Sequence, residues 1–336
     1  MSEATCDYTV VCVSEALAPI THMAGSSGNE AMIAREPVVT PRGIRMVPHL
    51  SGNALRHRCI RAPGMDWLVE EYGLNGALTL PELNFLYHGG ALTEGGGRED
   101  TRKIAEMQRL WPLLRLLGGC LPDQILAGSL QVWRGLLICE ENRATLTALL
   151  PDPCVLPERL RSAESFVVGY LYTRSDARKT HAAMASEEAR TVDSDARDAE
   201  GKKPKGNQIP FVGQLVMRGS VFVHGFTLPR TSLIELGALL WSLRLWSAAG
   251  GTVGGQASRG HGRLGLSVLT GDYDADVAVQ AYLDHARAAR VEAVDWLHRA
   301  FAKRADTKPA KGKGGNGKTT VSADPVDADG LFEREE

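Results

Sequence analysis

The sequence predicts an α+β fold built around an antiparallel sheet. Residues 8–13 are a short β-branched run and residues 214–228 a longer β-branched and aromatic run, as is typical of strands, and residues 264–269 predict another short strand. Residues 231–246 place leucines at helical spacing behind a Thr or Ser cap, and a second helical pattern covers residues 274–302. Strands and helices separated by long inserts favour an antiparallel sheet over a doubly wound parallel one. The βαββαβ order of a ferredoxin-like, RRM-like core fits these segments best.

After the first strand, the sequence predicts a loop, an extended segment and then a helix. Residues 23–29 (MAGSSGN) are small and polar and predict a loop, and residues 36–48 predict an extended excursion with a turn at Pro41–Gly43. From Ser51 the pattern becomes helical, with Ser51 or Asn53 as the cap and an apolar stripe of Leu55, Cys59 and Ile60.

Three inserts divide the chain. Residues 65–150 carry apolar side chains at helical spacing and predict an inserted helical region. After a strand-like run at 166–172, residues 174–208 are highly charged and almost free of large apolar side chains, so we expect a hairpin that projects from the body. Residues 303–336 predict a disordered tail, which leaves 1–64 and 151–302 as a discontinuous core.

Composition places bounds on function. The chain has 336 residues, 43% hydrophobic and 23% charged, and no apolar run near the roughly 20 residues that span a bilayer. The N-terminus lacks a basic, cleavable leader, so we expect a soluble cytoplasmic protein without membrane contact. Six widely spaced cysteines predict buried free thiols and no metal site, and no cofactor is expected. The net charge of -2 makes local basic stripes more informative than the total.

The glycine-rich segment 250–263 is the most informative stretch. Its glycines, including Gly254 and Gly255, let the backbone approach a ligand, while Arg259, His261 and Arg263 can meet phosphates or stack on bases. The segment follows a helix and leads into a strand, which is the reverse of the dinucleotide-binding order. A formal P-loop match at 312–319 has flanks that cannot pack as a strand and helix, so it predicts no nucleotide site.

An arginine group on the helix after Ser51 offers a phosphate-contacting face. Arg56, Arg58 and Arg61 lie on this helix, and Arg42 and Arg45 of the extended excursion can join them. Taken alone, such a group is a solvated helix face.

No catalytic constellation emerges from the sequence. His22 has Asn29 and Glu30 beyond it, but nothing positions a partner, and a satisfied structural histidine is the simpler interpretation. The sequence therefore predicts a protein that is not an enzyme.

In chain order these segments resemble the RAMP superfamily of CRISPR-associated proteins. Residues 18–22 (APITH) with 25–27 (GSS) look like that family's first-strand ending and small-residue loop. Residues 47–56 (VPHLSGNALR) resemble its segment leading into a basic helix, and residues 254–263 (GGQASRGHGR) resemble its glycine-rich loop. The match spans residues 8–268 and looks most like the backbone subunit of class 1 effector complexes, the type IV variety among them.

The resemblance implies a hand-shaped subunit that polymerises along guide RNA. Residues 65–150 would be its fingers and residues 174–208 its thumb, on a palm made by the core. The implied partners are guide RNA, a DNA or RNA target strand, copies of the same chain and other CRISPR effector subunits. Some relatives cleave target RNA with an aspartate after the first strand, but this chain has none between Asp7 and Asp66, so cleavage is not carried over.

Two sets of residues are predicted to contact RNA. The surface set is His22, Ser26, Ser27, Arg42, Ser51, Asn53, Arg56, Arg61, Gly254, Gly255, Arg259, His261 and Arg263. The thumb set is Arg174, Arg178, Lys179 and Met184.

Two other functions stay open at this point. One is an RNA endonuclease of the same superfamily that processes guide precursors, with His22 or His261 as general base. The other is a metabolic enzyme whose glycine-rich loop binds a phosphorylated small molecule.

Overall fold

The computed structural model describes residues 4–27, 30–93, 100–150, 156–173, 210–269 and 271–302. Within these ranges the strands are β1 (Cys6–Ala16), β2 (Met23–Ser27), β3 (Glu30–Ile33), β4 (Arg35–Thr40), β5 (Gly43–Leu50), β6 (Gly119–Cys120), β7 (Ile125–Leu126), β8 (Gln131–Val132), β9 (Gly135–Leu137), β10 (Val167–Thr173), β11 (Pro210–Val216), β12 (Val221–Thr231) and β13 (Leu264–Leu269). The helices are α1 (Gly52–Leu55), η1 (Arg56–Arg61), α2 (Ala62–Glu71), α3 (Leu80–His88), α4 (Thr101–Leu110), α5 (Pro112–Leu117), α6 (Arg143–Leu149), η3 (Ala163–Phe166), α9 (Leu233–Ala248), η5 (Ala257–Arg259) and α10 (Ala275–Phe301).

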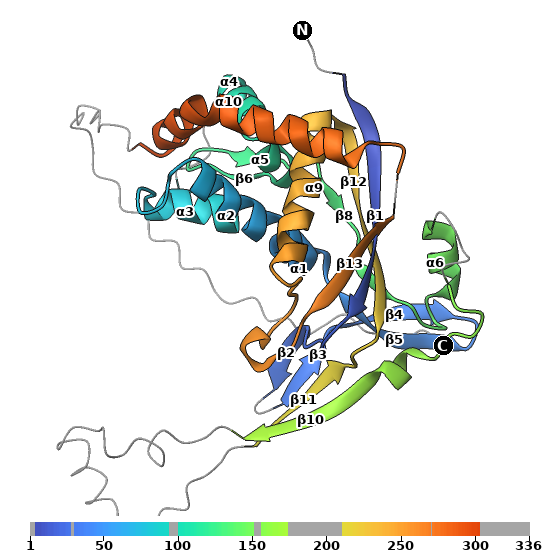
Figure 1. Cartoon of the computed structure of the whole chain (residues 1–336). Coiled ribbons are helices and arrows are strands. Elements are labelled where there is room, and N and C mark those ends of the chain that lie inside the picture. The colour runs from blue at the N-terminus through green and yellow to red at the C-terminus, as the bar shows by residue number, and fades with distance from the viewer. Residues whose placement is uncertain are drawn as a thin grey trace, which may run out of the picture. The chain divides into compact units, whose positions relative to one another are not determined.

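A seven-stranded antiparallel sheet forms the centre of the fold. Its order is β13-β1-β12-β9-β5-β4, with β8 also paired to β12, and β1 and β12 are the two long central strands (Figure 1). Alternate side chains of β1 face opposite ways: Val10 and Cys12 enter the main core, and Val11 enters a smaller cluster. The edge strand β4 contains Pro37, which has no N–H to donate. The predicted α+β class with an antiparallel sheet is confirmed.

Helices cover one face of this sheet. The helix α9 packs along α10 and against the sheet, and both bury apolar side chains in the main core (Figure 1). Ser232 caps α9 through a capping box: its hydroxyl accepts from the Glu235 N–H, and the Glu235 carboxylate accepts from the Ser232 N–H at 2.8 Å. Trp111 and Trp296 are among the largest fully buried side chains here.

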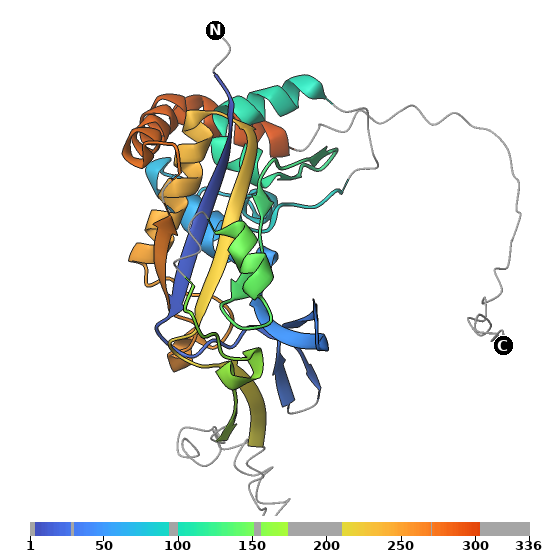
Figure 2. The ribbon, with the colours of Figure 1, turned by 90° about the vertical axis from the view of Figure 1, so that its right-hand side faces the viewer.

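The opposite face of the sheet is only partly covered. Figure 2 shows the short helix α6 in front of β1 and β12, with the large helices behind the sheet. A small cluster that includes Val11, Ile138, Leu146 and Val223 holds α6 in place.

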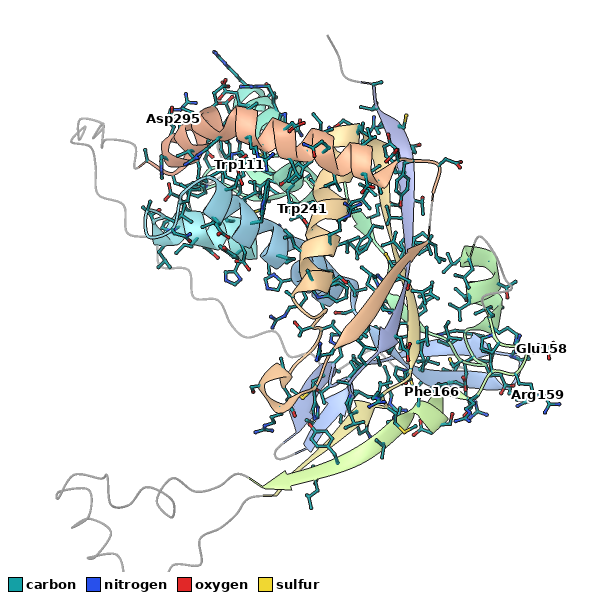
Figure 3. The ribbon with its side chains drawn as sticks, in the orientation of Figure 1. Trp111, Glu158, Arg159, Phe166, Trp241 and Asp295 are labelled. Atoms are coloured by element: carbon teal, nitrogen blue, oxygen red, sulfur yellow. The ribbon has the colours of Figure 1, made fainter. Side chains whose placement is uncertain are left out.

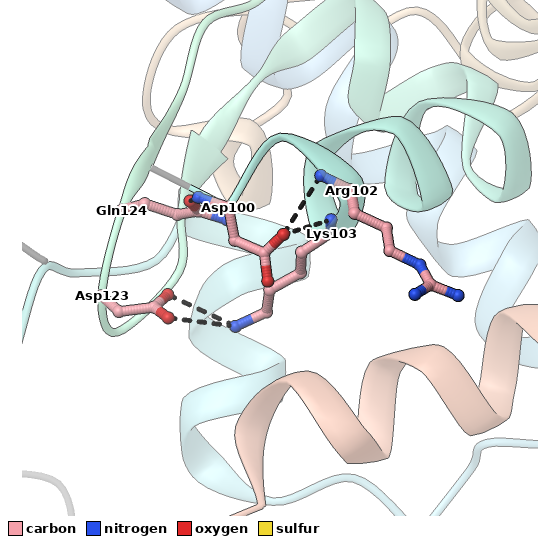
Figure 4. Close-up of polar contacts among 5 residues, drawn as sticks. All are labelled: Asp100, Arg102, Lys103, Asp123 and Gln124. Carbon is pink, nitrogen blue, oxygen red and sulfur yellow. Dashed lines mark hydrogen bonds and ion pairs between the residues drawn. The ribbon is translucent and has the colours of Figure 1, made fainter. Parts of the chain in front are cut away.

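The start of α4 shows how the helical region is fastened. Asp100 caps the helix by accepting from the backbone N–H groups of Arg102 and Lys103, both at 3.1 Å (Figure 4). Lys103 Nζ lies 3.3 Å from Asp123 Oδ1, and Gln124 Oε1 accepts from the Asp100 N–H at 2.8 Å. These contacts tie α4 to the turn between β6 and β7.

The helices of region 65–150 share the main hydrophobic core with the sheet, and the described residues up to Phe301 form one compact unit. The region also contains four short strands, β6 to β9, and β8 and β9 belong to the central sheet. The insertion is therefore less purely helical than the sequence pattern predicts. The proposed thumb at 174–208 and the tail at 303–336 lie outside the described residues.

A second, four-stranded sheet has the order β10-β11-β3-β2. Residues 23–27 form its strand β2, antiparallel to β3, so the loop predicted for this segment is wrong. Small residues are poor strand formers alone, but β3 supplies the pairing that fixes their backbone here. No described helix is long and apolar enough to cross a membrane.

Candidate nucleic-acid interface

The glycine-rich segment forms a narrow loop closed by its own backbone. The Val253 N–H donates to the Gly262 carbonyl at 2.7 Å, and Thr252 forms a bridge with Arg263. Gly262 has φ +83°, and a Cβ added there would lie 2.2 Å from the Val253 carbonyl oxygen. Only glycine fits this position, because both the backbone angle and the space exclude a side chain.

This loop is fastened to the end of β1. The Gly262 N–H donates to the Pro19 carbonyl at 2.8 Å, and the Leu17 N–H donates to the Arg263 carbonyl at 2.9 Å. Buried Thr21 and Gly255 exchange two further bonds: the Gly255 N–H donates to the Thr21 carbonyl, and the Thr21 hydroxyl donates to the Gly255 carbonyl. A Cβ at Gly254 would lie 2.8 Å from the Thr21 carbonyl oxygen. The structure thus brings together two segments separated by more than 200 residues.

His22 connects the segment that begins at Ser51 to the end of β1, beside the glycine-rich loop. The Ser51 N–H donates to His22 Nε2 at 3.1 Å, and the Ser51 hydroxyl accepts from the Ala54 N–H as the cap of α1. A backbone N–H can only donate, so Nε2 is the acceptor and the ring is neutral. Burial, with His49 at 6.4 Å between ring centroids, lowers the pKa of His22. The acceptor nitrogen of His22 is therefore already engaged by the Ser51 N–H, which favours a structural role for this ring.

The three arginines of the predicted phosphate-contacting face differ in how far they are buried. Arg56, Arg58 and Arg61 lie on η1, a π-helical turn of a kind often found at functional sites. Arg58 is exposed, whereas Arg56 is half-buried and burial lowers its pKa. Asn53, one turn earlier, is exposed.

Arg61 corrects the sequence prediction of a phosphate contact. Its side chain is buried, and its guanidinium donates to the carbonyls of Phe85, Leu86 and Gly118 at 3.3, 3.0 and 2.9 Å. It therefore caps the C-terminal end of α3 inside the core and is not presented to a ligand.

The remaining predicted residues are placed as follows. The turn between β4 and β5, which carries exposed Arg42, points away from the glycine-rich loop (Figures 1 and 2), and Arg42 lies 3.6 Å from Glu140. Ser26 and Ser27 pair in β2 with Ala31 and Glu30. Arg259 and Arg263 are exposed, and His261 is half-buried. The thumb candidates Arg174, Arg178, Lys179 and Met184 lie outside the described residues.

Two contributors were missed by sequence reasoning. Gln256, with an unusual φ of +62°, donates through Nε2 to the Tyr170 hydroxyl at 2.7 Å. The ring of Tyr170 lies edge-on to that of His261, with 5.8 Å between the ring centroids. The same ring covers Gly213 of β11, where a side chain would collide with it. These contacts join the loop to the strands that flank residues 174–209.

We expect Gly262→Ala to lower the free energy of unfolding by about 2–4 kcal/mol, because it adds a steric clash to an unfavourable φ. Gly260→Ala is the matched control: its φ is +81°, but a Cβ there meets nothing within 4 Å. The control should therefore cost only about 1 kcal/mol. Urea denaturation compares the two, and equal losses would contradict the close packing at Gly262.

No protein-family model matches the sequence, and no curated protein matches it. Among solved structures, a chain in a type IV-B CRISPR complex aligns with a TM-score of 0.52 and 16% identity, over 80% of this chain and 92% of that chain. Csc2 from Thermofilum pendens aligns with a TM-score of 0.34 and 14% identity, over 87% and 80%. The first likeness confirms, at the level of fold, the resemblance to CRISPR-associated proteins. The chain has the fold of a subunit in a type IV-B CRISPR complex.

Proposed function

We propose that this chain is a non-catalytic backbone subunit of a class 1 effector complex. It binds guide RNA, oligomerises along it with other CRISPR effector subunits, and presents it to a DNA or RNA target strand. The observation that carries the proposal is that three segments, at Thr21–His22, Ser51–Arg56 and 252–263, are joined to one another by hydrogen bonds. The fold shared with a chain of a type IV-B CRISPR complex supports it.

The proposal includes a ferredoxin-like palm made of 1–64 and 151–302. The antiparallel order β13-β1-β12-β9, with α9 between β12 and β13 in sequence, supports this assignment. Residues 65–150 would be the fingers, and residues 174–208, between β10 and β11, the thumb.

RNA would be held mainly through its phosphates. The exposed guanidinium groups of Arg58, Arg259 and Arg263 offer charge, and the glycine-rich loop brings backbone close to the ligand. Contacts of this kind read no bases, so binding would be largely independent of sequence.

The double variant Arg259→Ala, Arg263→Ala is expected to bind guide RNA more weakly without unfolding. Each lost phosphate contact lowers the slope of log affinity against log salt by about 0.7 on a single strand, so the slope should fall by about 1.4. Anisotropy titrations at several salt concentrations measure it. The matched control is Arg102→Ala with Arg299→Ala, two exposed arginines on α4 and α10. An unchanged slope in the Arg259→Ala, Arg263→Ala variant would count against the proposal. If the purified wild-type protein contains no RNA, a small phosphorylated ligand is favoured instead.

The absence of RNA cleavage is part of the proposal. A general base must accept a proton, and His22 Nε2 already accepts from Ser51. Unprocessed repeat RNA incubated with the protein should stay intact. If the protein cuts this RNA, and the cutting is lost in His261→Ala but kept in the control His88→Ala, the chain is an RNA endonuclease instead.

A further inference from the structure

A groove crosses the sheet face that α6 leaves open. Two adjoining hollows of about 370 and 350 Å³ share Val13 of β1 and Val221 of β12 as lining residues. The first continues over Ile138 and Phe166, and the second over Leu266 of β13. The first hollow therefore has an apolar floor made by side chains of β1, β12, the end of β9 and the segment before β10, whereas the second hollow is also lined by the polar side chains of Glu15 and Ser267.

One end of the groove carries positive charge. Arg159 and Arg161 line the first hollow on either side of Leu160, and both are exposed. Figure 3 shows Arg159 and Phe166 on the same side of the molecule, away from the large helices. Within the part of the chain that the structure describes, neither guanidinium forms an ion pair. An apolar floor beside two such cations fits an acidic peptide with apolar anchors.

The sequence itself contains such a peptide. Residues 331–336 read Leu-Phe-Glu-Arg-Glu-Glu, an apolar pair followed by three glutamates and one arginine. Leu331 and Phe332 match the apolar floor, and the glutamates match Arg159 and Arg161. The 28 residues between 302 and 331 reach up to about 90 Å when extended, enough to meet a neighbouring molecule.

We propose that the segment Leu331–Glu336 of one copy docks in this groove of a second copy. The inference rests on the proposed function, because it supplies the contact that joins copies along RNA. The peptide and the groove are different surfaces, so the contact is head-to-tail, and repetition gives an open chain of copies.

The full-length variant Leu331→Ala, Phe332→Ala tests the contact. Its affinity for an RNA long enough for one copy should equal that of the wild type. Cooperative assembly on an RNA several times longer should weaken at least about tenfold in analytical ultracentrifugation, because both apolar anchors are lost. Assembly as strong as that of the wild type overturns the proposal.

A charge exchange tests the pairing directly. Arg159→Glu with Arg161→Glu should weaken assembly, and adding Glu333→Arg and Glu335→Arg should restore it. The control Arg102→Glu with Arg299→Glu makes the same charge change on α4 and α10 and should leave assembly unchanged. If Arg159→Glu with Arg161→Glu weakens binding to the one-copy RNA as well, the groove holds RNA and the proposal fails.

A labelled peptide of residues 324–336 separates this inference from the proposed function. It should bind saturably, without RNA, to the Leu331→Ala, Phe332→Ala protein and lose that binding when Arg159 and Arg161 are also reversed. Peptide binding by a protein that binds no RNA would overturn only the proposed function. RNA binding without peptide binding would overturn only the docking.

Discussion

Replacing Arg61 with methionine is expected to lower the free energy of unfolding by about 3 kcal/mol. Methionine fills much of the space but donates no hydrogen bond. The carbonyls of Leu86 and Gly118, which accept from Arg61 at 3.0 and 2.9 Å, would be left buried without that donor. Each unsatisfied buried group costs about 1–3 kcal/mol, partly offset because the guanidinium no longer has to be desolvated.

Urea denaturation followed by circular dichroism measures this loss. Arg58→Met is the matched control, since Arg58 lies on the same π-helical turn but is exposed, and it should change stability by less than about 0.5 kcal/mol. Equal stabilities of the two variants would show that Arg61 is not needed by the core. RNA affinity measured on the folded fraction of Arg61→Met should match that of the wild type.

The buried pair Ser14 and His224 should make stability depend on pH. His224 is fully buried on β12, its Nε2 lies 2.9 Å from the Ser14 hydroxyl, and burial lowers its pKa to about 4. In the unfolded chain a histidine titrates near 6.5, so the unfolded state binds a proton first as the pH falls. The stabilisation is complete above about pH 6.5 and lost progressively toward pH 4, by about 3 kcal/mol.

The test compares unfolding free energies at pH 7 and pH 4.5 in the wild type and in His224→Gln. The variant should lose less stability over this interval, because its side chain does not titrate, while the carboxylates contribute equally to both proteins. His88→Gln, at an exposed site, should behave as the wild type does. The same pH dependence in wild type and His224→Gln would contradict the assignment.

Local signals in the sequence predict much of the fold correctly. Alternation over 8–13 marks the middle of β1, and the caps at Ser51 and Ser232 were both among the predicted ones. These signals work because each depends on neighbours within a few residues. The run 214–228 is instead two strands, since Met217–Ser220 form a turn with Gly219 at φ +83°.

The candidate site depends on contacts that no local pattern encodes. Arg61 has the composition of a surface helix position, and its burial follows from carbonyls 24 to 57 residues away. Gln256 meets Tyr170 across 86 residues. By contrast, the three segments that meet at the loop can be recognised in the sequence, because each contains several glycines, a proline or a helix cap.

The proline in edge strand β4 has a consequence for how copies can associate. A strand added at that edge would lack one ladder donor at Pro37, so growth by sheet extension is disfavoured there. Any contact between copies of the chain at this edge would therefore depend on side chains rather than on a continuous ladder of backbone hydrogen bonds.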